Sequence, residues 1–132
     1  MGREFRGRIG LIMPAPGTAT EMEFHHAAPA GVQLASTRMP LEVSTFEVLS
    51  KIDGYAESCA TLLAQAKPNL IVFCCTAGSF VKGIGHDREI IRRIEKSTNI
   101  SATTTSTAVV EALAAVGARR IAVVTPYLDE VN

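Results

Sequence analysis

The sequence predicts an α/β fold, a mostly parallel sheet with helices on both faces. Short apolar runs alternate along the chain with longer segments in which apolar residues recur every three or four positions, the pattern of strands alternating with helices. One run, "NLIVFCC" (69–75), is apolar throughout, as expected for a strand covered on both faces. With 132 residues, 47% of them hydrophobic, the chain suits one domain or one lobe of something larger.

The first half of the chain contains two predicted strands and one long predicted helix. "RIGLIMP" (8–14) is a short apolar run stopped by Pro14, and a loop with one short helix near 21–26 follows it. "GVQLASTRMP" (31–40) alternates in part and forms the second strand. A helix is predicted from about 45 to 66. Its apolar positions are Val48, Leu49, Ile52, Tyr55, Cys59, Leu62, Leu63 and Ala66.

The second half adds three strands and two helices. The third strand is 69–75, a short amphipathic helix covers 86–96, and 100–106 is a short strand running into a helix over 107–120. "RIAVVTP" (120–126) is another buried strand, and "YLDEVN" is the opening of one more helix. The residues expected to bury or delimit these helices are Ile90, Ile91 and Ile94 inward on the first, Thr105 or Ser106 near the cap of the second, and Gly117 at its stop. Together these elements predict a Rossmann-like or flavodoxin-like lobe, in which ligands bind beyond the carboxyl ends of the strands.

Composition and charge exclude several function classes. Thirteen basic residues balance thirteen acidic ones, which argues against a nucleic-acid surface or a polybasic membrane patch. The chain has few aromatic residues and no Trp, so platforms for base stacking are not expected. No apolar stretch approaches the length of a membrane span. Three cysteines, two of them adjacent, make a poor disulfide framework, so we expect reduced thiols and a cytoplasmic protein.

Two apolar runs share a spacing. Arg8-Ile9-x-(apolar)-(apolar)-x-Pro14 matches Arg120-Ile121-x-(apolar)-(apolar)-x-Pro126. One interpretation is that buried strands resemble one another. The other is duplication, in which residues 1–118 form a first α/β lobe and residues 119–132 are the first strand and helix start of a second lobe that is missing.

The loop after the third predicted strand contains the residues best suited to chemistry. Cys75 lies at that strand end, and a helix beginning after Gly78 would favour its thiolate. Backbone N–H groups there, with the Thr76 and Ser79 hydroxyls, can hold a carboxylate. Thr18 follows the first strand and offers a further donor. The cysteine would act as a proton-transfer base or as a nucleophile.

Each of these residues also has a purely structural interpretation. Free cysteines often only pack in a core, and this is the expected role of Cys59 and Cys74, whereas for Cys75 both roles stay open. Runs of Thr and Ser are common in caps and turns. His25, His26 and His86 do not have the spacing of metal ligands, and the first two are expected on the surface. "GSFVKGIG" lacks the Gly-Lys-Ser/Thr order of a phosphate-binding loop.

Three stretches together resemble a known superfamily. "RIGLIMPAPGTATEME", "VFCCTAGS" and "TTTSTAVVEALAAVGARRIAVVTPYLDEVN" are similar to the aspartate/glutamate racemase superfamily, in the branch of maleate cis-trans isomerase and arylmalonate decarboxylase. The resemblance implies two similar α/β lobes of pseudo-symmetric arrangement, an active site between them, and no metal or organic cofactor. It also implies one cysteine from each lobe.

The resemblance assigns roles to individual residues. Cys75 stands where the first-lobe cysteine of isomerases and racemases stands, whereas the decarboxylase has a glycine there. Thr76 and Ala77, with the Tyr127 hydroxyl, match the region that binds a substrate carboxylate. The full set expected to position the substrate is Pro14, Gly17, Thr18, Thr76, Ala77, Gly78, Ser79 and Tyr127.

Two features depart from the family pattern. Maleate isomerases usually carry an Asn in a pattern like Ser-Asn-Thr-Thr in the first loop, whereas this chain has Pro16-Gly17-Thr18-Ala19, which puts strict maleate specificity in doubt. The second lobe and its cysteine are expected after Asn132, so we expect the sequence to be a portion of a longer enzyme.

The sequence therefore predicts a cofactor-independent isomerase or racemase that acts on a small carboxylate or dicarboxylate through Cys75. The enzyme alternative is an arylmalonate-type decarboxylase. The non-enzyme alternative is a degenerate lobe that binds a small carboxylate. A lobe without its twin would expose apolar surface, so we also expect self-association into a homo-oligomer.

Overall fold

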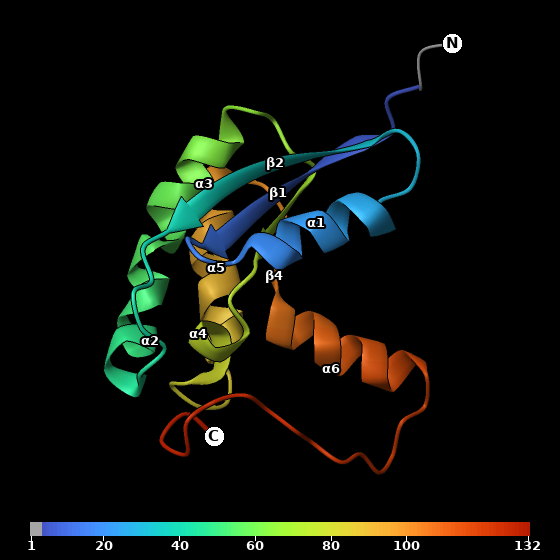
Figure 1. The fold of residues 1–132 in the computed structure, drawn as a ribbon. Helices are drawn as coiled ribbons and strands as arrows, with labels where there is room; N and C mark the ends of the chain where they lie inside the picture. The colour runs from blue at the N-terminus through green and yellow to red at the C-terminus, as the bar shows by residue number, and fades with distance from the viewer. Residues whose placement is uncertain (1–3) are drawn as a thin grey trace.

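A computed structural model describes residues 4–132 and contains a four-stranded parallel sheet with the strand order β2-β1-β3-β4 (Figure 1). The predicted α/β fold is thereby confirmed. Three of the strands correspond to the predicted apolar runs, and the fourth is the short strand predicted over 100–106. Their bounds are β1 Gly7–Pro14, β2 Val32–Met39, β3 Leu70–Phe73 and β4 Ala102–Thr104.

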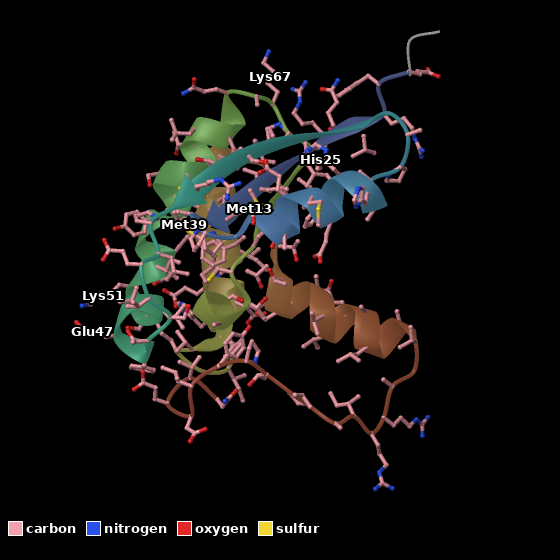
Figure 2. All side chains as sticks on the ribbon, viewed as in Figure 1. Met13, His25, Met39, Glu47, Lys51 and Lys67 are labelled. Atoms are coloured by element: carbon pink, nitrogen blue, oxygen red, sulfur yellow. The ribbon has the colours of Figure 1, made fainter. Side chains whose placement is uncertain are left out.

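β1 is one of the two central strands of the sheet. It pairs in parallel with β2 along its whole length and with β3 over four residues. Leu11, Ile12 and Met13 are completely buried because both faces of this strand are covered. Met13 and Met39, labelled in Figure 2, lie near the carboxyl ends of β1 and β2.

In the described part of the chain, five α-helices and one 3-10 helix connect these strands, and a sixth α-helix follows β4. Figure 1 shows α1 on one side of the sheet and α3 and α5 on the other. The larger apolar cluster lies between the sheet and α2–α5, and the smaller one lies on the side of α1. The bounds are α1 Thr18–Ala27, α2 Phe46–Ile52, η1 Asp53–Tyr55, α3 Ala56–Ala64, α4 Thr76–Phe80, α5 His86–Thr98 and α6 Thr105–Ala115.

The long helix predicted over 45–66 is divided in the structure. A 3-10 turn, η1, separates α2 from α3. Gly54 lies at the centre of this turn, and glycine is a poor former of helix interiors. Asp53 turns inward there to meet charged partners. Of the apolar positions predicted to face inward, four are buried and Tyr55 and Leu62 are exposed: the buried ones are Leu49, Ile52, Cys59 and Leu63.

Helix boundaries in the second half differ from prediction by a few residues. The structure confirms α5 and the burial of its three isoleucines. α6 begins at Thr105, and its cap is Thr104, whose hydroxyl oxygen accepts a hydrogen bond from the Thr107 amide. Thr105 and Ser106, predicted to lie near the cap, are the first two residues of the helix. Gly117 follows the helix end with a φ of +70°, the conformation that favours glycine at this position.

The strand predicted over 120–126 is not formed. These residues pair with no strand in the described part of the chain, and Val123 and Val124 are 72% and 94% exposed. A strand needs a neighbour to accept its hydrogen bonds and cover its apolar side chains, and this segment runs below α6, away from the sheet (Figure 1). The predicted helix opening after it is a turn in which Val131 donates to the Leu128 carbonyl. The division of the chain into residues 1–118 and 119–132 stays a prediction.

Within residues 4–132, no helix has the length and apolar character needed to cross a membrane.

Candidate active site

The carboxyl edge of the sheet brings the predicted loops into one row. Ile12 of β1, Phe73 of β3 and Thr104 of β4 are aligned by the strand pairings. Two residues after these three positions in the sequence are Pro14, Cys75 and Ser106. The sequence interpretation that the chemistry-bearing residues gather at strand ends is therefore supported for Pro14 and Cys75. Figure 1 shows the arrowheads of β1 and β2 pointing towards α2 and α4 at this edge.

Cys75 lies inside the larger apolar cluster, immediately before α4. It is 5% exposed and packs with residues from β1, α2, α3 and α5. Burial raises the pKa of the Cys75 thiol, and a hydrogen bond from the backbone N–H of Gly78 acts in the opposite direction. The prediction that the helix begins after Gly78 was wrong, because α4 begins at Thr76 and contains Gly78. The N–H of Gly78 nevertheless faces the sulfur.

Gly78 limits the space around the Cys75 thiol. A Cβ atom at residue 78 would lie 2.9 Å from the Cys75 Sγ and 2.5 Å from the Cγ2 of Ile52. Both distances are shorter than real contacts between such atoms. Only glycine lets α4 approach α2 this closely, so the Cys75 thiol is held between the backbone of α4 and Ile52.

Cys74 lies on the opposite face of the sheet. It belongs to the smaller apolar cluster and lines a cavity of about 350 Å³ together with Glu23, Phe24, Thr76 and Thr105. Burial, with the neighbouring Cys75 as a smaller cause, raises the pKa of Cys74 to about 12. The packing role predicted for Cys74 agrees with this burial. The same holds for Cys59, which is 6% exposed.

The hydroxyl of Ser79 is already occupied by the protein. Ser79 is completely buried, and its Oγ donates to the Thr76 carbonyl at 2.8 Å. The Ser106 hydroxyl forms a hydrogen bond of 2.6 Å with the same Oγ. Ser79 therefore ties α4 to α6. A cavity of about 450 Å³ lies beside this pair; its lining includes the apolar residues Phe80, Ile84 and Val110 and, besides the serines, Asp87, Arg88 and Thr107.

The first loop lies on the Cys74 side. Gly17 precedes α1, and its N–H donates to the Pro14 carbonyl at 2.9 Å. Thr18 is exposed and opens α1, the helix that covers the smaller cluster, and Thr20 two residues later lines the Cys74 cavity. The structure therefore groups the Thr20 hydroxyl with Cys74 and Thr76. Ala77, by contrast, is buried in the larger cluster with Cys75.

Tyr127 reaches the site without the strand that was expected to precede it. Its ring packs edge-on against Phe80 with centroids 5.8 Å apart, and both rings contact the larger cluster. Val131 is buried in the same cluster, and the Glu130 carboxylate accepts a hydrogen bond from the Phe46 amide at 3.1 Å. The last residues of the sequence thus fold back over α4 and α2, as the red end of the ribbon in Figure 1 shows.

One charged group near the site, the Asp53 carboxylate, was not predicted from the sequence. Asp53 is 4% exposed and forms ion pairs with Lys82 and Arg93. A signal for it was present, because Asp53 follows Leu49 by four residues and precedes Ala56 by three, which places a carboxylate on the buried face of the helical pattern.

The histidines do not form a metal site with other groups. Within residues 4–132, no cluster of three or more His, Cys, Asp or Glu side chains has the geometry of a metal site. His25, labelled in Figure 2, and His26 are exposed on the last turn of α1, as predicted. His86 is buried at the start of α5.

The chain is similar to enzymes that act on small dicarboxylates. It is 29% identical to a maleate isomerase from Pseudomonas putida over 92% of this chain and 53% of the relative. The structure of a maleate isomerase from Pseudomonas putida with maleate superimposes with a TM-score of 0.87 at 28% identity, over 95% of this chain and 55% of that one.

A second solved structure concerns the cysteine chemistry directly. It is a cysteine-to-serine variant of the maleate cis-trans isomerase from Nocardia farcinica with a covalently bound succinylcysteine intermediate. It matches with a TM-score of 0.87 at 27% identity, over 95% of this chain and 55% of that one. The chain thus spans about half the length of the relatives it matches.

A family model describes nearly the whole sequence. The model of arylmalonate decarboxylase matches residues 9–132. This range includes all the strands and helices described above except the first two residues of β1. The chain is therefore a member of the arylmalonate decarboxylase family, and it also resembles the maleate isomerases.

Proposed function

We propose that this chain is part of a cofactor-independent isomerase or racemase that acts on a small carboxylate or dicarboxylate, maleate-like in kind, with Cys75 as nucleophile or acid/base. The observation that carries the proposal is Cys75 itself, a thiol at the carboxyl edge of a parallel sheet in a chain similar to maleate isomerases. The succinylcysteine intermediate in a relative supports a covalent role for a cysteine. A cytoplasmic location, where thiols stay reduced, belongs to the same proposal.

For a maleate-like substrate, the proposed step is addition of sulfur to the double bond. The Cys75 thiolate forms a C–S bond with one alkene carbon, the π electrons move to the neighbouring carbon, and a proton is added there to give a succinyl thioether. The bond between the two carbons is now single and can rotate. Loss of the proton and the thiolate then restores the double bond in the trans geometry.

The resting state of Cys75 sets a requirement for this chemistry. Burial raises the pKa of the thiol, so the protonated form dominates at neutral pH. The proton must leave before sulfur can attack, and the side chain must become accessible. The segment that contains Tyr127 and Val131 packs on the cluster around Cys75. A movement of this segment would therefore give solvent and substrate access to the thiol.

The residues proposed to position the carboxylate differ in how well their surroundings support them. Gly78 has its N–H directed at the Cys75 sulfur, and Thr76, the residue after Cys75, lines the cavity that Cys74 also lines. Tyr127 lies over Phe80, with its cluster contacts adjacent to Cys75. The remaining proposed residues form the surrounding frame: Pro14, Gly17, Thr18, Ala77 and Ser79.

The domain organisation is part of the same proposal. Residues 1–118 form the first lobe, and residues 119–132 begin a second lobe that completes the site. The repeated spacing of Arg8–Pro14 in Arg120–Pro126 supports it. The exposed apolar side chains of 121–124 support it as well, because such a surface normally has a partner.

The test is a matched pair of cysteine variants. The protein is incubated with maleate, fumarate is followed by proton NMR, and peptide mass spectrometry locates any succinyl adduct. Cys75→Ala should abolish the adduct and lower turnover by about 10⁴-fold or more, the usual scale for loss of a nucleophile. Cys74→Ala, one residue away, should retain both. An adduct on Cys74, or turnover that survives Cys75→Ala, would contradict the proposal.

Two alternatives are tested by the same preparation. The family model favours an arylmalonate-type decarboxylase as the second enzyme candidate, and release of carbon dioxide from an arylmalonate without isomerase activity would select it. The burial of Cys75 favours a degenerate lobe that only binds a small carboxylate. Binding of maleate measured by calorimetry, with no adduct and no product, would select that one.

A further inference from the structure

One buried carboxylate binds residues on both sides of the connection between α4 and α5. Asp53, 4% exposed, accepts from the Lys82 Nζ at 2.8 Å and from the Arg93 Nη1 at 2.8 Å. The His86 Nε2 lies 3.7 Å from the same carboxylate. Lys82 lies two residues after the end of α4, beyond Val81, and His86 and Arg93 belong to α5.

The connection that Asp53 holds is exposed and irregular. Gly83 and Gly85 adopt positive φ angles of +94° and +89°, and Ile84 between them is fully exposed. Glycines at such angles cost conformational entropy on folding, so the loop gains its order from its ends. Lys82 and His86 are those ends, and both face Asp53.

The segment that contains Asp53 also contacts the middle of α4, through Ile52. Ile52, the residue before Asp53, packs against Gly78, which in turn packs against the Cys75 Sγ. α4 has only five residues, too few for a helix to be stable by itself. Its position therefore depends on contacts from outside, and residues 52 and 53 supply them at its middle and at its end.

We propose that Asp53 is a positioning residue for Cys75, acting through Lys82 to fix the end of α4 and so keep the thiol closed against Ile52 and Gly78. The proposal rests on the proposed function in one respect only, since that function is the reason why the position of this thiol matters. The contacts themselves predict a measurable property of Cys75, its accessibility in the folded protein.

The experiment measures alkylation by iodoacetamide at each cysteine of the folded protein, by peptide mass spectrometry. Asp53→Asn keeps the shape of the side chain and removes its charge. Loss of a charge-assisted hydrogen bond destabilises the closed state, in which the thiol is buried. The rate of alkylation at Cys75 should therefore rise on the order of tenfold. Asp53→Asn also weakens the contact to Arg93, which binds Glu57 of α3, so the control is read in Lys82→Met. There the rates at Cys59 and Cys74 should stay within about twofold, because Lys82 pairs with Asp53 and not with α3 or β3. A rise at all three cysteines would indicate general loosening and overturn the proposal.

Two further variants make the result decisive. Lys82→Met cuts only the contact to the loop and should reproduce the Cys75 rise. It also decides the question if Asp53→Asn does not fold. Glu47→Gln is the matched control, because it removes the same charge from an exposed lysine pair, Glu47–Lys51, 2.8 Å apart on α2 (Figure 2). An unchanged Cys75 rate in Lys82→Met would refute the proposal. Since no substrate is involved, a failed maleate assay leaves this result standing.

Discussion

The two faces of the sheet are built differently, although the end of β3 supplies one cysteine to each. The face with Cys75 is covered by α2, α3, α4 and α5 and is reinforced by the ion pairs of Asp53. The face with Cys74 is covered by α1, which buries none of its own residues, and contains a cavity of about 350 Å³. One face is therefore organised around a fixed thiol, and the other is loosely covered.

Removing an apolar side chain from each face should show the largest contrast. Ile94 on α5 is completely buried, whereas Met22 on α1 is 55% exposed. Ile94→Ala should lower the free energy of unfolding by about 2–5 kcal/mol, and Met22→Ala by less than about 0.5 kcal/mol. Urea unfolding followed by circular dichroism measures both. Similar losses for the two variants would mean that α1 contributes as much to the core as α5 does.

A smaller contrast is expected between two glycines on the Cys75 side. Gly78→Ala forces a Cβ against Ile52 and the Cys75 thiol, so it should cost about 1–3 kcal/mol of stability. Gly54→Ala meets no atom within 4 Å and should be neutral or stabilise by about 0.4–1 kcal/mol. Thermal unfolding of both variants provides the measurement. A Gly78→Ala protein as stable as the parent would show that α4 can move away from α2 at little cost.

The finest contrast is the pH at which each thiol reacts. The pKa of Cys74 is raised to about 12 by burial and by Cys75, whereas at Cys75 the Gly78 N–H opposes the effect of burial. A raised pKa means less thiolate at a given pH, so both should react more slowly than a free thiol at pH 8. As the pH is raised, alkylation at Cys75 should begin before alkylation at Cys74. The reverse order would mean that access rather than ionisation controls both rates.

Local patterns were enough to predict most of the fold. The apolar runs that became β1, β2 and β3, and the inward isoleucines of α5, follow from side-chain periodicity, which depends on neighbours in the chain. The break between α2 and α3 was not predicted, although Gly54 was a local signal for it, and the ion pairs of Asp53 at this turn involve partners 29 and 40 residues away. Residues 120–126 have the pattern of a buried strand, but a pattern supplies no neighbouring strand, and these residues are exposed.

The candidate site divides in the same way. The position of Cys75 at a strand end follows from the length of one apolar run. The partner of Ser79 is Ser106, 27 residues along the chain, and this pairing depends on how α6 packs against α4. Thr18 was expected to donate to the same pocket as Cys75, but it opens α1 on the other side of the sheet, where Thr20 of that helix lines the Cys74 cavity.

The opposite orientation of the two adjacent cysteines also bears on oxidation. A disulfide requires sulfur atoms about 2.05 Å apart, whereas neighbouring residues in extended backbone direct their side chains to opposite sides. Closing a ring between Cys74 and Cys75 would require one thiol to leave its apolar cluster and cross to the other face. The alternation of the strand therefore protects the thiol proposed for catalysis from capture by its own neighbour in the chain.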